Sequence, residues 1–91
     1  MPNIDIQRPH HLGRDQARRL VEDLAARMQA KLDIETQWRD DTLLFSRSGI
    51  DGSIEVGSDS IRVRAKLGML MAAFKPMLEQ EIHRRLDEQL G

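Results

Sequence analysis

The stretch DTLLFSRSGIDGSIEVGSDSIRVRAKLG, residues 41–68, decides the fold, because it reads as successive antiparallel strands. In its last part apolar side chains alternate with cations, in the order Ile61, Arg62, Val63, Arg64, Ala65, Lys66, Leu67. Alternation of this kind is typical of a strand with one buried face and one wet face.

The earlier parts of the same stretch follow the same pattern. Residues 50–56 alternate apolar and polar side chains, and residues 57–60 supply turn residues that make a hairpin with the last strand. Residues 42–48 place Leu43 and Phe45 on one parity, and Gly49 marks a turn or a bulge. A three-stranded sheet with one apolar face needs a covering layer, which the flanking segments must supply.

Two further strands are expected before this stretch. Residues 34–39 alternate again, with Trp38 closing one end of the core, and we expect them to form a fourth central strand of the sheet. Asp40 and Asp41 predict a tight turn into the next strand. Residues 2–8 predict a short strand whose pairing Pro9 would end or confine to a sheet edge.

Two helices complete the predicted layer. Residues 14–32 carry apolar side chains at spacings of three and four, namely Ala17, Leu20, Val21, Leu24, Met28 and Leu32. A second helix is expected from residue 69 to about residue 89, and its stripe consists of Met71, Phe74, Leu78, Ile82, Leu86 and Leu90. Pro76 is expected to kink this helix or to restart it.

The segments together predict an α+β fold with the order β-α-β-β-β-β-α. Two helices on one face of an antiparallel sheet form the simplest two-layer sandwich that buries every stripe. Residues 1–91 are expected to be a single α+β domain, since this length leaves no room for a second core.

Composition excludes several classes of function. The formal net charge is −1, so no global charge attracts nucleic acid or an anionic membrane. The chain contains no cysteine, no apolar run long enough for a membrane span and no recognisable leader, and we expect a cytoplasmic protein.

The sequence offers no catalytic or metal-binding pattern. His10 and His11 are adjacent and point to opposite sides of an extended segment, and His83 stands alone, so all three are expected to be surface or connector residues. Glycine-rich phosphate loops and nucleophile motifs are absent from the sequence. We therefore expect no catalytic residue, no cofactor, no metal and no enzymatic activity.

Two groups of residues are candidates for binding. Arg62, Arg64 and Lys66 place three cations on one strand face and are a candidate anion contact, although neighbours such as Glu55 would offset the charge of a merely solvated face. Residues around the start of the second helix are apolar on a second side, and this surface is either a partner-binding patch or ordinary core packing. Its members are Met69, Leu70, Ala73 and Met77.

The chain resembles the polyhydroxyalkanoic acid system proteins, a small bacterial family encoded beside genes for storage-polyester granules. The resemblance covers nearly the whole chain and rests on residues 8–10 (RPH), Leu12, Gly13, Ala17, 41–43 (DTL), Phe45, 47–49 (RSG), Gly52, Ile54, Val56, Leu67, Gly68, Leu86 and Asp87. It implies a non-enzymatic, granule-associated or regulatory role, and it assigns no functional residues.

Three functions follow as expectations. The first is an accessory or regulatory binding protein of the polyhydroxyalkanoate system, which meets the granule surface or another protein of that system through Met69, Leu70, Ala73 and Met77. A second is a structural homodimer that buries the same apolar surface or an exposed strand edge. A third is a small nucleic-acid-binding regulator that uses Arg62, Arg64 and Lys66.

Overall fold

The computed structural model describes residues 3–90, with side chains described as far as Glu88, and shows two helices packed on one face of a five-stranded antiparallel sheet. The elements follow the predicted order β-α-β-β-β-β-α, with a short 3₁₀ helix, η1, before the last helix. The strands are β1 (Asn3–Pro9), β2 (Glu35–Arg39), β3 (Thr42–Arg47), β4 (Ile50–Val56) and β5 (Ser60–Leu67). The helices are α1 (Arg14–Leu32), η1 (Met69–Phe74) and α2 (Lys75–Leu90).

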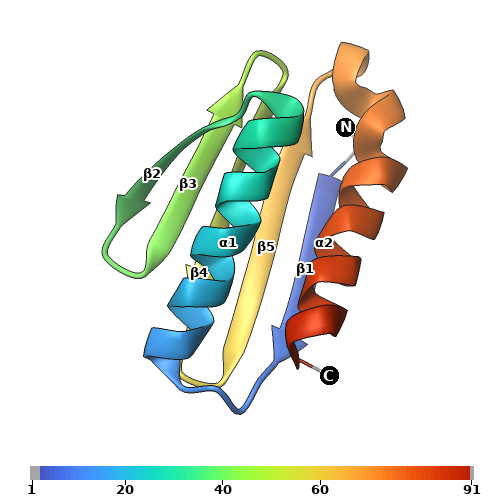
Figure 1. Ribbon diagram of the computed structural model, residues 1–91. Coiled ribbons are helices and arrows are strands. Elements are labelled where there is room, and N and C mark those ends of the chain that lie inside the picture. The colour runs from blue at the N-terminus through green and yellow to red at the C-terminus, as the bar shows by residue number, and fades with distance from the viewer. Residues whose placement is uncertain (1–2, 91) are drawn as a thin grey trace.

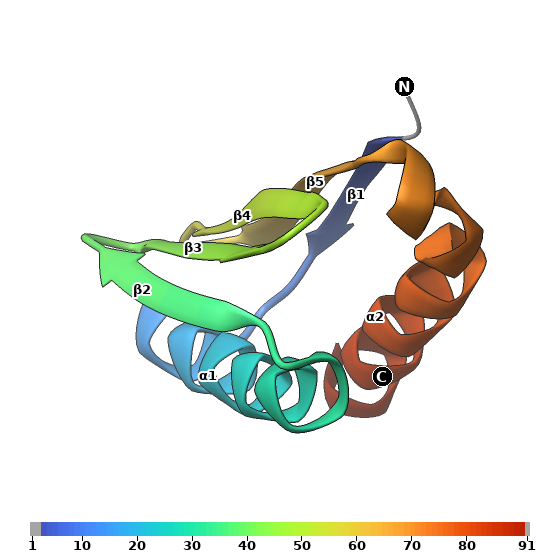
Figure 2. The same ribbon diagram turned by 90° about the horizontal axis from the view of Figure 1, so that it is seen from above.

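The strand order across the sheet is β1-β5-β4-β3-β2. Strands β2 to β5 form a meander in which each strand pairs with the next along the chain. Strand β1 instead pairs with β5 and forms the other edge of the sheet, with Ile4 opposite Ala65. Helix α1 carries the chain from one sheet edge to the other, and both helices cover the same face (Figure 2). Pro9 lies at the end of an edge strand, as its missing N–H requires.

The core lies between the sheet and the helices. In β3, β4 and β5, inward apolar residues alternate with outward residues that are polar apart from Leu44, which confirms the predicted half-buried strands. Helix α1 has the predicted bounds and buries its stripe, with Ala25 as an additional buried member and Leu32 only half-buried. Helix α2 contributes Leu78, Ile82 and Leu86.

The expectation of a fourth central strand is wrong, because β2 is the outer strand at one edge of the sheet. It pairs with β3 alone, through the two-residue turn at Asp40 and Asp41, and its inward residues Thr36 and Trp38 are only half-buried. The Trp38 ring is instead covered by the Arg18 guanidinium, whose central carbon lies 4.2 Å from the ring centroid.

The second predicted helix is divided at Pro76. Since proline has no N–H, the Ala72 carbonyl accepts a hydrogen bond from the Lys75 N–H, with the tighter spacing of a 3₁₀ helix. The chain then continues as α2, so restarting the helix is the outcome that the structure shows. The change from 3₁₀ to α-helical rotation also takes Phe74 out of line with the buried stripe. Its side chain is 41% exposed, and its predicted core position is wrong. Leu90, predicted for the same stripe, lies beyond the described side chains.

Candidate functional site

An apolar surface protrudes where β5 passes into α2. We call Met69, Leu70, Ala73, Phe74 and Met77 the apolar tip; all five are exposed. Met69 and Leu70 are each 93% exposed, and Met77 is 46% exposed. The segment lies at one end of the molecule, beyond the end of β5 (Figure 1). The structure therefore leaves the four residues predicted for partner binding in solvent and adds Phe74 to them.

The segment that carries the apolar tip is held against the core by Met71. This side chain packs against the core, and its Cγ lies 2.6 Å from the position that a Cβ on Gly49 would occupy. Gly49 has a φ of 86°, a left-handed conformation that favours glycine. The Gly68 N–H donates to the Gly49 carbonyl at 2.8 Å. The β3–β4 turn thus fixes the start of η1, while the side chains of the apolar tip point away from the core into solvent.

The predicted basic row lies on the sheet face away from the helices, and two of its three cations are paired. The Arg62 guanidinium donates to both carboxylate oxygens of Asp5, at 3.1 and 2.9 Å. This hydrogen bond holds the pKa of Asp5 below its usual range and raises that of Arg62. Arg64 is paired with Glu55. Each arginine reaches diagonally across the ladder, because Asp5 stands opposite Arg64 and Glu55 opposite Arg62.

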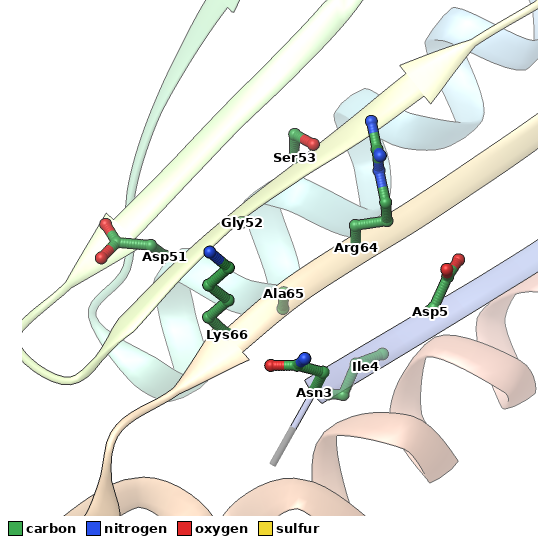
Figure 3. A pocket seen from close by; sticks show the side chains of 9 residues that line it. All are labelled: Asn3, Ile4, Asp5, Asp51, Gly52, Ser53, Arg64, Ala65 and Lys66. Atoms are coloured by element: carbon green, nitrogen blue, oxygen red, sulfur yellow. The ribbon is translucent and has the colours of Figure 1, made fainter. Parts of the chain in front are cut away.

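A shallow hollow on this face is lined by Lys66, the remaining cation of the row, together with Arg64. Its volume is about 510 Å³. Figure 3 views it from the side away from the helices and shows the Lys66 side chain extending from β5 toward Asp51 on the neighbouring strand β4. No ion pair of Lys66 is found among the described side chains. Arg64, Asp5 and Asp51 line the same hollow, so cations and carboxylates are mixed in it, and an anion contact here stays a prediction.

His10 is a connector residue, as expected, but it is buried. It is 3% exposed and joins the β1–α1 connection to the β4–β5 turn. Its Nδ1 accepts a hydrogen bond from the Leu12 N–H at 3.2 Å, and its Nε2 lies 3.1 Å from the Gly57 carbonyl. With Nδ1 accepting from the backbone, Nε2 is the ring nitrogen placed to donate to the Gly57 carbonyl. Both ring nitrogens are used within the fold, so His10 is a structural residue.

The described residues show neither a metal-binding cluster nor a membrane-spanning helix. No group of three or more metal-ligating side chains is found among them. Within the same part of the chain, no helix is both long and apolar enough to cross a membrane.

Comparison with known families identifies the group to which this fold belongs. Residues 4–90 match the model of a family described as "Putative polyhydroxyalkanoic acid system protein". The chain belongs to this family. Neither a search of curated proteins nor a search of solved structures finds a match. The family description names a system and states no reaction, so membership places the chain in the polyhydroxyalkanoic acid system without assigning its role there.

Sequence reasoning missed two features of this family member. The stripe at α-helical spacing includes Phe74, and although Pro76 is expected to kink or restart the helix, the spacing does not show that the restart leaves Phe74 exposed. The burial of His10 depends on Gly57, which is 47 residues away, and no local pattern announces that contact.

Proposed function

We propose that this chain is a non-enzymatic accessory protein of the polyhydroxyalkanoate system that binds the surface of the storage polyester through its apolar tip. The observation that carries the proposal is the exposure of Met69 and Leu70, each 93% accessible, in a member of that family. An exposed group of large apolar side chains is typical of a contact surface.

The size of the apolar tip favours a polymer surface over a protein partner. A stable protein–protein interface uses about 20 to 30 residues on each side, whereas the tip has the five residues named above. A short protruding segment can instead insert its side chains into an apolar phase that has no fixed shape. Methionine, with its flexible and polarisable side chain, adapts to such a surface.

The charge pattern supports the same partner. Residues 67–74 (LGMLMAAF) contain no charged side chain, and charge begins at Lys75, whose ammonium lies 3.8 Å from Glu79. An uncharged polyester offers ester carbonyls and aliphatic groups, so it requires no ionic partner from the protein. Desolvation on contact is therefore confined to apolar side chains, which favours association.

The experiment is co-sedimentation of the purified protein with polyester particles that carry no other protein. The triple variant Met69→Ser, Leu70→Gln, Met77→Gln is expected to lose binding. Burying one such side chain contributes about 1.5 to 3 kcal/mol, so Leu70→Gln alone should weaken binding by about tenfold or more.

The matched control is Leu44→Ser, which removes a half-buried apolar side chain from the open sheet face and should bind like the parent protein. Circular dichroism verifies that each variant is folded. Unchanged binding by a folded triple variant, or no binding of the parent protein to bare particles, would contradict the proposal.

A further inference from the structure

The two edges of the sheet are protected to different degrees. Helix α2 runs alongside β1 (Figure 1), and the Arg8 guanidinium is 2.7 Å from the Asp87 carboxylate, which joins that edge to α2. Pro9 also removes one N–H from β1. No described element lies beyond β2 at the other edge. The unpaired backbone of β2 is thus the open end of the sheet, where a further strand can add.

The turn after β2 determines which backbone groups face outward. Arg39 pairs with Thr42 across the two-residue turn, so the polar backbone groups of Arg39, Gln37 and Glu35 point toward β3. The N–H and C=O groups of Thr36 and Trp38 therefore point to the free edge. A strand that joins this edge forms its hydrogen bonds with these two residues.

The side chains of β2 are complementary to a second copy of themselves. Glu35, Gln37 and Arg39 lie on the open sheet face, opposite Ser46, Leu44 and Thr42 of β3. No ion pair of Glu35 or Arg39 is found among the described side chains, whereas Asp5 and Glu55 on the same face are both paired. If a second copy of β2 pairs in antiparallel orientation with a two-fold axis at Gln37, Glu35 of each copy lies opposite Arg39 of the other. The interface then contains two such ion pairs.

The backbone permits the same register. With Gln37 on the two-fold axis, Thr36 of each copy faces Trp38 of the other, so the outward N–H and C=O groups of those residues meet as hydrogen-bonded pairs. On the helix face, Trp38 would gain a β-branched neighbour at its exposed edge. Charge, backbone polarity and side-chain size therefore agree on one register.

We propose that β2 pairs with β2 of a second copy of this chain, in antiparallel orientation about Gln37, to make one continuous sheet from two five-stranded sheets. The interface is isologous, since both copies use the same strand. It does not rest on the proposed function, because the apolar tip lies past the end of β5, well away from β2 (Figure 1).

The test is the molar mass of the whole chain by sedimentation equilibrium over a range of about 1 μM to 1 mM, since an edge of five residues predicts a weak dimer. Arg39→Glu alone and Glu35→Arg alone each put like charges opposite each other and should weaken dimerisation by about tenfold or more. A mixture of the two variants restores opposite charges and should form a heterodimer. The double variant Glu35→Arg, Arg39→Glu should dimerise with itself.

A second measurement reads the register directly. The chain has no cysteine, so Gln37→Cys introduces a single thiol at the two-fold axis. A non-hydrogen-bonded antiparallel pair has a Cα separation of about 4.5 Å, within the range of a disulfide, and the variant should cross-link on mild oxidation. Gln7→Cys, on the covered edge strand β1, is the matched control and should stay uncross-linked.

Three outcomes would overturn the proposal: a monomer at every concentration, equal cross-linking of the two cysteine variants, or a dimer that survives Arg39→Glu but is lost with Leu70→Gln. The last would assign self-association to the apolar tip. Polyester binding is measured separately and is expected to be unchanged in Arg39→Glu, so failure of this dimer and failure of the proposed function are distinguishable.

Discussion

At the scale of single residues, Gly52 is the described glycine with the least space for a side chain. It stands opposite Phe45 on the core side of the sheet, and a Cβ there would lie 2.3 Å from Phe45 Cζ and 2.6 Å from the Arg64 carbonyl oxygen. The Phe45 ring, which is buried, thus fills the space that a side chain on Gly52 would need. The glycine lets an aromatic ring pack against the centre of the sheet.

Gly52→Ala is therefore expected to destabilise the fold by about 1 to 3 kcal/mol, as overpacking does in a tight core. Urea unfolding measures the change. Ser53→Ala, on the neighbouring residue that faces the open side, is the control and should change stability by less than about 0.5 kcal/mol. Equal stability of Gly52→Ala and the parent protein would show that Phe45 moves aside without cost.

At the scale of elements, Pro76 determines how η1 and α2 are joined. The Ala72 carbonyl accepts from Lys75 because residue 76 has no N–H to offer. The orientation of the apolar tip relative to α2 follows from this junction.

Pro76→Ala is expected to supply that N–H and to convert residues of η1 into a continuation of α2. Backbone chemical shifts of residues 69–74 should then move toward α-helical values, while the free energy of unfolding changes by less than about 1 kcal/mol. Gln80→Ala, at an exposed position of α2, is the control and should leave those shifts unchanged. If residues 69–74 keep their shifts in Pro76→Ala, the 3₁₀ segment is set by its neighbours instead.

The sequence predicts an element well when the element is determined by its own residues, and poorly when it depends on partners far away in the chain. The bounds of α1 follow from its own stripe, and the alternation in residues 50–67 follows from their own spacing. The sequence shows that the start of the second helix is apolar on a second side, but it leaves open whether Met69, Leu70, Ala73 and Met77 are exposed or packed in the core, and it places Phe74 in the buried stripe. The edge position of β2 and the pairing of β1 with β5 were not predictable, since both depend on partners distant in the sequence. The pairing of Arg62 with Asp5 is non-local for the same reason.

At the scale of the whole molecule, Glu81 joins the two helices. The Lys31 ammonium of α1 lies 3.2 Å from the Glu81 carboxylate of α2, and Arg85 lies 3.4 Å from the same oxygen. The hydrogen bond from Lys31 is the main cause that holds the pKa of Glu81 below its ordinary value of 4.5, against burial, which raises it. A lowered pKa means that folding favours the charged form.

The contribution of Glu81 to stability is therefore fully present above pH 4.5 and is lost as the pH falls through its lowered pKa in the folded state. Glu81→Gln should reduce the free energy of unfolding at pH 7 by about 1 kcal/mol or less, and should flatten its decline in acid. Melting temperatures between about pH 7 and pH 3 measure both effects. Glu79→Gln, whose carboxylate pairs with Lys75 in the same helix, is the control. If the melting temperature falls equally steeply with decreasing pH in Glu81→Gln and in the parent protein, this role of Glu81 is contradicted.

Strand β1 comes early in the sequence and pairs with β5, which comes much later, and this order has a consequence for synthesis. Asn3 pairs with Lys66 and Pro9 with Ser60, so the first strand has no partner until the ribosome has made the fifth. At about 5 to 20 residues per second, that interval lasts several seconds. Ile4 and Ile6, both buried in the finished sheet, are uncovered during that time. We expect the meander from β2 to β5 to form first and β1 to close the sheet last, which makes residues 3–9 the part of the nascent chain most in need of protection.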